Sequence, residues 1–270
     1  MPLLSQLKQF FRPLAPEGIA LAYSGGVDST LMLSALQEMQ SEEPFPMAVL
    51  TMQTRFQTDG EIAEAVSQAE TMGAEVRLFS FDPLSLPQLR DNPPDRCYWC
   101  KRHVFTAFRK HCHDHGIAHL ADGTNADDRH AYRPGLRALA ELGVRSPLCE
   151  LGIGKAAIRE CARLRNLPCA LRPAMPCLAT RFEYGTRLEP QMLDRVAKGE
   201  ALLRRYLPVN AVLRLRVQHN LARIETAPSS WPCLIGHHRE IAEGLHALGF
   251  DYAAMDLDGY RCGCYDRPSR

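Results

Sequence analysis

The sequence of 270 residues lacks three features that would each point to a class of protein. No apolar run approaches the roughly 20 residues that a membrane-spanning helix needs, and the longest apolar segments, 18–23 and 46–52, have the length of strands. The N-terminus has no basic segment followed by an apolar one, so we expect no secretory signal peptide. The formal net charge is only +1, which argues against a nucleic-acid partner. These absences predict a cytoplasmic protein that binds neither membrane nor nucleic acid.

The composition is otherwise that of an ordinary globular protein. Hydrophobic residues make up 46% of the chain and charged residues 23%, which is sufficient for a buried core. The 10 cysteines are too few for a disulfide scaffold but many for a reducing compartment. In such a compartment, clustered cysteines more often bind metal or react than form disulfides. The length predicts roughly two domains.

Strand and helix patterns alternate along the first part of the chain. The predicted strands are 18–23, 46–52, 75–80 and 117–121, and the predicted helices are 30–39, 60–72, 97–115 and 155–166. This alternation predicts an α/β fold with a doubly wound parallel sheet. The proline-rich segment 81–95 is predicted to be a loop that interrupts the alternation.

The pattern changes after Gly185. The elements predicted there are a helix at 190–206, strands at 211–218 and 221–226 joined by a tight turn, a helix near 234–248 and a strand at 250–257. We therefore predict a first domain over residues 1–186 and a smaller C-terminal α+β domain over residues 187–270.

A glycine- and serine-rich loop lies between the first predicted strand and the helix that follows it. Gly25 and Gly26 let the backbone approach a polyanion, and the helix start offers unpaired N–H groups at the positive end of the dipole. Ser24 and Ser29 add hydroxyl donors. Asp28 would repel a phosphate unless a cation intervened, and a magnesium ion that bridges the carboxylate and the phosphates would resolve this conflict.

The loop is not a Walker A motif, because the spaced Gly-Lys-Ser/Thr is absent. It resembles the signature of the PP-loop ATP pyrophosphatases, which have an adenine nucleotide alpha hydrolase-like fold and cleave ATP between the α and β phosphates. Asp122, Gly123 and Asn125 follow the fourth predicted strand. Doubly wound folds bind ligands at the carboxyl ends of their strands, so we expect these residues near the nucleotide.

Further motifs occur in a definite order along the chain: 96–101, 122–128, 132–135, 146–148, 176–181, 184–186, 214–216 and 222–225. Together with the phosphate loop, this set resembles the LarE family of ATP-dependent sulfur transferases, which act in nickel-pincer nucleotide synthesis. The resemblance implies that ATP adenylates a carboxylate of a pyridinium dicarboxylate mononucleotide and that pyrophosphate is released. A sulfur held by the protein then displaces AMP and leaves a thiocarboxylate. The resemblance also implies a homo-oligomer.

The resemblance assigns roles to residues in both predicted domains. Asp28 and Cys177 would be the catalytic residues, and Cys177 would hold or supply the sulfur. Arg214 and Arg216 would bind a substrate phosphate, which suits the forked donors of arginine; their spacing along a strand places both on one face. The weaker candidates near that site are Arg181, Glu200 and Glu225.

The source of the sulfur is open between two chemistries. Some members of the family sacrifice the sulfur of the cysteine at the Cys177 position, and others use three cysteines to hold a 4Fe–4S cluster. Cys97 and Cys100 are three residues apart at a predicted helix start and so share a face. With Cys177 they would supply three thiolates for such a cluster. A zinc site and small buried apolar side chains are the alternatives for the same cysteines.

Three other functions fit the phosphate loop less completely. A tRNA thiolase would require an RNA-binding module, and the sequence shows none. An amidating ligase of the NAD or GMP synthetase type would leave the three cysteines without a role. A regulatory module without turnover would not require an intact loop. Cys262 and Cys264, near the C-terminus, are expected to be free thiols.

Overall fold

The computed structural model describes residues 2–130 and 133–261, so Tyr132, Cys262 and Cys264 lie outside the described residues. The chain divides into two compact units. The first contains Met1–Phe81 and Asp95–Arg172, and the second contains Asp82–Pro94 and Pro173–Arg270. We predicted a single boundary at residue 186, whereas this division falls after Arg172 and assigns the proline-rich segment to the second unit.

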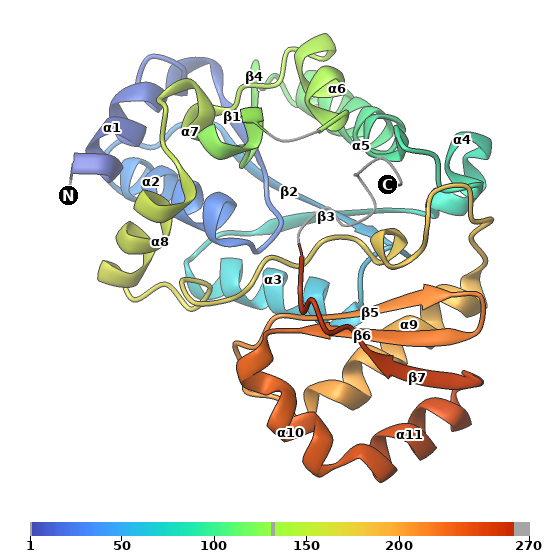
Figure 1. The fold of residues 1–270 in the computed structure, drawn as a ribbon. Coiled ribbons are helices and arrows are strands. Elements are labelled where there is room, and N and C mark those ends of the chain that lie inside the picture. Colours follow the sequence, from blue (N-terminus) through green and yellow to red (C-terminus); the bar gives the residue numbers. More distant parts are fainter. Residues whose placement is uncertain (1, 131–132, 262–270) are drawn as a thin grey trace. The chain divides into compact units, whose positions relative to one another are not determined.

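The first unit is built on a parallel sheet with the strand order β3-β2-β1-β4, as Figure 1 shows. Its strands are β1 (Ile19–Ala22), β2 (Met47–Thr54), β3 (Val76–Phe81) and β4 (His119–Ala121). β1 pairs in parallel with both β2 and β4, so that Leu21 lies opposite Val49 on one side and Ala121 on the other. The predicted α/β class with a parallel sheet is confirmed.

Helices cover both faces of this sheet. They are α1 (Pro2–Phe11), α2 (Val27–Glu42), α3 (Asp59–Thr71), α5 (Arg96–Asp114), α6 (Gly135–Glu141), α7 (Pro147–Glu150) and α8 (Lys155–Leu164), with short 3₁₀ turns at Ala15–Glu17 and Ala126–His130. Ile19 and Leu21 of β1 pack into a core with α1, α2, α3 and α8. Ala20 faces the opposite way, into a core with Phe105 and Phe108 of α5. The alternation along β1 therefore produces the doubly wound arrangement.

The second unit contains a smaller mixed sheet with the order β5-β6-β7. Its elements are α4 (Pro87–Arg90), α9 (Pro190–Arg204), β5 (Leu213–Gln218), β6 (Leu221–Thr226), α10 (Trp231–Gly236), α11 (His238–Ala247) and β7 (Tyr252–Met255), with 3₁₀ turns at Pro83–Ser85, Leu178–Arg181 and Pro228–Ser230. β5 and β6 form the predicted antiparallel hairpin, and β7 pairs with β6 in parallel. The helix predicted near 234–248 is two helices, because the chain leaves the helical conformation at His237 (φ −119°, ψ 25°).

The two faces of the smaller sheet differ in chemistry. Leu215 points toward α9, where a Cβ on Gly199 would lie 2.4 Å from its side chain, so the helix packs very closely on this apolar face. Arg214, Arg216 and Glu225 alternate with the apolar positions and are buried on the other face. No helix in the described part of the chain is long and apolar enough to cross a bilayer.

Candidate active site

The phosphate loop connects β1 to α2, and hydrogen bonds among its own residues hold its conformation. The Ser24 N–H donates to Ser29 Oγ at 3.3 Å, the two serine hydroxyls lie 3.3 Å apart, and Ser29 Oγ donates to the Gly26 carbonyl at 3.2 Å. Gly25 has a φ of +71°, and a Cβ there would lie 2.6 Å from the Cβ of Ala65 in α3. Positive φ and close packing therefore both require glycine at this position.

The segment that follows β4 lies directly beside this loop. The strand order reverses between β1 and β4, because β2 and β3 lie on one side of β1 and β4 lies on the other. A Cβ on Gly123 would lie 3.2 Å from the backbone nitrogen of Ser29, and Asn125 Nδ2 donates to Asp28 Oδ1 at 3.4 Å. The structure thus brings the two predicted nucleotide segments together at a topological switch point, where open α/β sheets bind ligands.

Lys155 is a residue of this site to which the sequence analysis assigned no role. It begins α8, and its Nζ forms an ion pair with Asp28 Oδ2. Asp127 accepts the backbone N–H of Lys155 at 2.7 Å, and its own N–H donates to Asn125 Oδ1 at 3.0 Å. These bonds fix the start of α8 beside the phosphate loop. The lysine lies 127 residues from Asp28, and its position at a predicted helix start was the only local signal.

Asp122 is a buried carboxylate that is surrounded by hydrogen-bond donors. It accepts hydrogen bonds from Thr124 Oγ1 at 2.6 Å and from Ser146 Oγ at 2.7 Å, and Lys101 Nζ lies 3.4 Å away. Lys101 follows Cys100 in α5. Asp122 therefore orders the segment after β4 and connects it to the first turns of α5.

Cys97 and Cys100 lie at the start of α5, the helix predicted for them. Both side chains are half-buried. They lie one turn apart on the helix, so the two sulfur atoms are on the same side of α5. Trp99 between them donates from its indole to Asp95 Oδ2 at 2.9 Å, so its ring orientation is held by the residue that directly precedes the helix.

In the second unit, Arg181 and Glu200 form a buried pair. Arg181 Nε and Nη2 donate to the two carboxylate oxygens at 2.8 and 3.0 Å, and Glu200 also accepts the Leu215 N–H at 2.9 Å. Only 1% of Arg181 and 5% of Glu200 is exposed. The bidentate pair joins the 3₁₀ turn Leu178–Arg181 to α9, and the Leu215 bond joins α9 to β5. The pair occupies two of the residues that we named as weaker site candidates.

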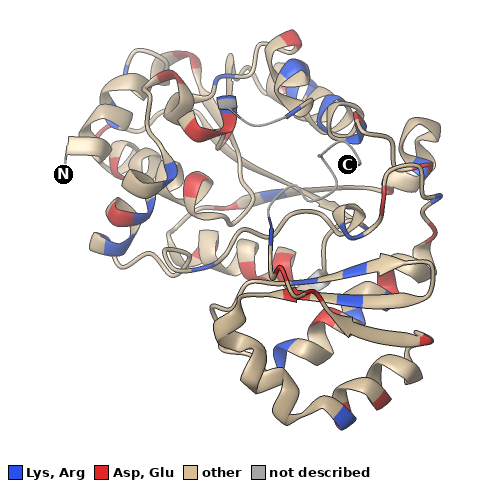
Figure 2. Ribbon diagram, in the orientation of Figure 1, with Lys and Arg blue, Asp and Glu red and all other residues tan. Residues whose placement is uncertain are grey.

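Arg214 and Arg216 share a face of β5 but differ in how their charge is balanced. Figure 2 marks the basic segments of the chain in blue and the acidic ones in red. Arg216 Nε donates to Glu225 Oε2 at 3.0 Å. Arg214 pairs with no carboxylate among residues 2–130 and 133–261 and donates instead to the carbonyls of Leu213 and Ala174, at 2.5 and 2.7 Å. Burial, followed by the nearby charge of Arg181, lowers the pKa of Arg214. Arg214 is therefore a buried cation that carbonyl oxygens, and no carboxylate of the described residues, bind directly.

The loop that bears Cys177 lies against these arginines. Cys177 is half-buried and precedes the 3₁₀ turn Leu178–Arg181. Arg181 Nη1 donates to the Cys177 carbonyl at 3.3 Å, Arg214 binds the Ala174 carbonyl on one side, and Arg216 binds the Thr180 carbonyl on the other. Three guanidinium groups thus hold the backbone around the predicted sulfur residue.

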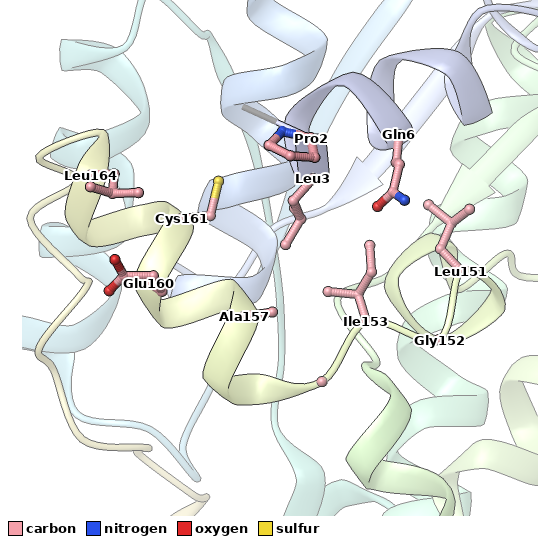
Figure 3. A pocket seen from close by; sticks show the side chains of 11 residues that line it. Pro2, Leu3, Gln6, Leu151, Gly152, Ile153, Ala157, Glu160, Cys161 and Leu164 are labelled. Carbon is pink, nitrogen blue, oxygen red and sulfur yellow. The ribbon is translucent and has the colours of Figure 1, made fainter.

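The predicted cysteine ligands are divided between the units, with Cys97 and Cys100 in the first and Cys177 in the second. The geometry of either unit alone does not test the three-thiolate site, which stays a prediction. A separate hollow of about 460 Å³ between α1 and α8 has a mostly apolar lining that includes Leu3 and Ile153 (Figure 3). None of its lining residues is a predicted site residue.

Similar proteins match this chain along nearly its whole length, although no family model matches it. An uncharacterised protein of Synechocystis sp. is 35% identical over 98% of this chain and 97% of its own length. An uncharacterised protein of Methanocaldococcus jannaschii is 30% identical over 96% of both chains. A pyridinium-3,5-bisthiocarboxylic acid mononucleotide synthase of Lactiplantibacillus plantarum is 31% identical over 91% of this chain and 87% of its own. The similarity therefore includes both units.

Proposed function

This chain belongs to the LarE family, and from that premise we propose that it is an ATP-dependent sulfur transferase acting on a pyridinium dicarboxylate mononucleotide. The reaction would convert a carboxylate of that nucleotide into a thiocarboxylate. The observation that supports the proposal most strongly is the meeting of the phosphate loop, Asp28, Asn125 and Lys155 at the switch point of the first sheet.

The first step would be adenylation. A substrate carboxylate oxygen attacks the α phosphorus of ATP, the bond to the β phosphate breaks, and pyrophosphate leaves. The N–H groups at the start of α2 and the hydroxyls of Ser24 and Ser29 would bind the leaving pyrophosphate. Lys155, which now pairs with Asp28, would contribute a positive charge at the same place. The product is an acyl adenylate, which is a far better electrophile than the free carboxylate.

Magnesium would bind at Asp28 during this step. The carboxylate is partly exposed, with 17% of the side chain accessible, and it accepts from Asn125 and Lys155. An oxygen ligand of this kind, open on one side to phosphates, fits the preference of magnesium for one or two carboxylates plus phosphate oxygens. The ion would supply neutralising charge, and the protein residues would place it.

The second step would be sulfur transfer. A sulfur nucleophile attacks the acyl carbon, the bond to the phosphate oxygen breaks, and AMP leaves with that electron pair. In the sacrificial version, the Cys177 thiolate is the nucleophile and forms a thioester with the acyl group. β-Elimination then removes the Cα proton and breaks the Cβ–S bond, so that the thiocarboxylate leaves with the sulfur and dehydroalanine stays at position 177. Arg214 would bind the phosphate of the mononucleotide, because its guanidinium is buried and pairs with no carboxylate in the described part of the chain.

In the alternative version, Cys97, Cys100 and Cys177 would hold a 4Fe–4S cluster. The three cysteines are half-buried, and two lie one helical turn apart at the start of α5, so the donors present fit such a group. The cluster, when bound, would supply exchangeable sulfide. We favour this version over zinc and over sacrifice, and we also expect a cytoplasmic homo-oligomer.

The test is an anaerobic assay of the full chain with ATP, magnesium and the dicarboxylate mononucleotide, reading pyrophosphate release and, by mass spectrometry, the exchange of oxygen for sulfur. Cys177→Ala should abolish sulfur transfer and retain pyrophosphate release. Thiocarboxylate formed by that variant at the rate of the unaltered protein would overturn the sulfur assignment. Iron and acid-labile sulfide that disappear in Cys97→Ala would support the cluster, and dehydroalanine at position 177 after turnover would support sacrifice instead.

A further inference from the structure

Asn92 is a fully buried polar residue in the proline-rich segment of the second unit. Its exposed fraction is 0%, and its φ of +44° lies in the left-handed region. Asparagine adopts this conformation more readily than most residues. Both backbone polar groups of Asn92 are hydrogen-bonded. The Asn92 N–H donates to the Leu89 carbonyl at 3.2 Å, and the Gly185 N–H donates to the Asn92 carbonyl at 3.3 Å. The side chain is therefore held in a defined position.

The side-chain amide of Asn92 points into the loop that follows Cys177. Its Nδ2 lies 3.4 Å from the Ala179 carbonyl, 3.2 Å from that of Phe182 and 2.9 Å from that of Glu183. Three carbonyl oxygens around one atom require a donor there, so the NH₂ group and not Oδ1 must face the loop. One NH₂ group has two hydrogens, so the carbonyls share them, with the bond to Glu183 the shortest.

One of these carbonyls, that of Ala179, belongs to the 3₁₀ turn that follows Cys177, and those of Phe182 and Glu183 come directly after this turn. Cys177 is the N-cap of the 3₁₀ turn Leu178–Arg181, and its carbonyl accepts the Thr180 N–H at 3.0 Å. Arg214 and Arg181 bind the carbonyls before and at Cys177. Asn92 binds carbonyls that follow Cys177 in the chain, so hydrogen bonds hold the backbone on both sides of the cysteine.

We propose that Asn92 is a positioning residue for sulfur transfer: its amide holds the turn Leu178–Arg181 so that the Cys177 sulfur is presented in one orientation. The inference rests on the proposed function, because it needs Cys177 to hold or donate the sulfur. Asn92 touches no reacting atom in this assignment. Its effect would be on the second step alone, since the phosphate loop that serves adenylation belongs to the first unit.

The experiment compares Asn92→Gly, Asn92→Asp and the unaltered full chain. Glycine keeps the left-handed backbone but removes the donor, and aspartate keeps the shape but sets an acceptor against three carbonyls. We expect thiocarboxylate formation to fall by about tenfold to 100-fold, as misplacement of a reacting group does, and pyrophosphate release to stay within about twofold. Alkylation of Cys177 by iodoacetamide, followed by peptide mass spectrometry, should accelerate by about threefold or more as the turn opens.

Asn166→Gly is the matched control. Asn166 is also an asparagine with positive φ (+55°), but it is exposed and follows α8 in the first unit. That variant should change neither half-reaction nor the alkylation of Cys177. Equal loss of both half-reactions in the Asn92 variants, or an unchanged alkylation rate, would overturn the proposal. If the unaltered protein forms no thiocarboxylate, the proposed function fails, and the alkylation rate still decides whether Asn92 holds the turn.

Discussion

The replacement Asp28→Asn tests the assignment of this carboxylate to magnesium. The two side chains have almost the same shape, so the change removes the charge and leaves the packing. In the structure, Asp28 accepts from both Lys155 and Asn125. An asparagine has one acceptor oxygen and can satisfy only one of these donors, so the variant loses the ion pair and part of the hydrogen bonding.

The structure indicates which effect should dominate. The pair is partly exposed, with 33% of the Lys155 side chain and 17% of that of Asp28 accessible, so its contribution to folding should be about 1 kcal/mol, near the value for exposed pairs. A loss of that size lowers the melting temperature by about 2–4 °C and is small against a typical unfolding free energy of roughly 5–15 kcal/mol. Loss of charge stabilisation at a transferring phosphate costs about 100- to 1,000-fold in rate.

The assay measures pyrophosphate release against magnesium concentration, together with equilibrium binding of the mononucleotide. We expect release to fall by about 100-fold or more, with mononucleotide binding nearly unchanged, because we assign the phosphate of that ligand to Arg214. Asp114→Asn is the control, since Asp114 pairs with Lys110 on the exposed surface of α5, and this variant should release pyrophosphate normally. Equal losses in release and in mononucleotide binding would refute the role of Asp28.

Two further predictions concern buried and titrating charges. Arg181→Met should lower the unfolding free energy by about 3 kcal/mol in urea titrations, because Glu200 would stay buried without its cation. Arg214→Met should change that free energy by less than about 1 kcal/mol and should raise KM for the mononucleotide by about tenfold; similar stability losses in both variants would contradict this contrast. Burial, followed by neighbouring positive charges, holds the pKa of His111 below its ordinary value of 6.5. The unfolded chain therefore binds a proton at His111 more readily than the folded chain does. The stability that neutral His111 contributes above pH 6.5 is lost as the pH falls below that value. His111→Gln should therefore make the urea midpoint change less with pH between about pH 5 and 7.

Local patterns were sufficient to predict most elements of the fold. The strand at 19–22, the helix that begins at Val27 and the hairpin of β5 and β6 lie within a few residues of their predicted positions, because apolar periodicity and turn residues act between neighbours in the chain. The phosphate loop could be found for the same reason, since its six residues are contiguous. The parallel sheet followed from the alternation of strands and helices.

Contacts between distant segments could not be predicted in this way. Lys155 pairs with Asp28 only because α8 begins beside the phosphate loop, and Asn92 meets the Cys177 turn across 87 to 91 residues. The prediction likewise gave Arg214 and Arg216 the same role, whereas the fold pairs Arg216 with Glu225 and leaves Arg214 facing carbonyls. The sequence by itself determined which residue types were available for phosphate, sulfur and substrate. Tertiary structure decided which charges are already neutralised, because that depends on burial and on partners that the fold brings within hydrogen-bonding distance.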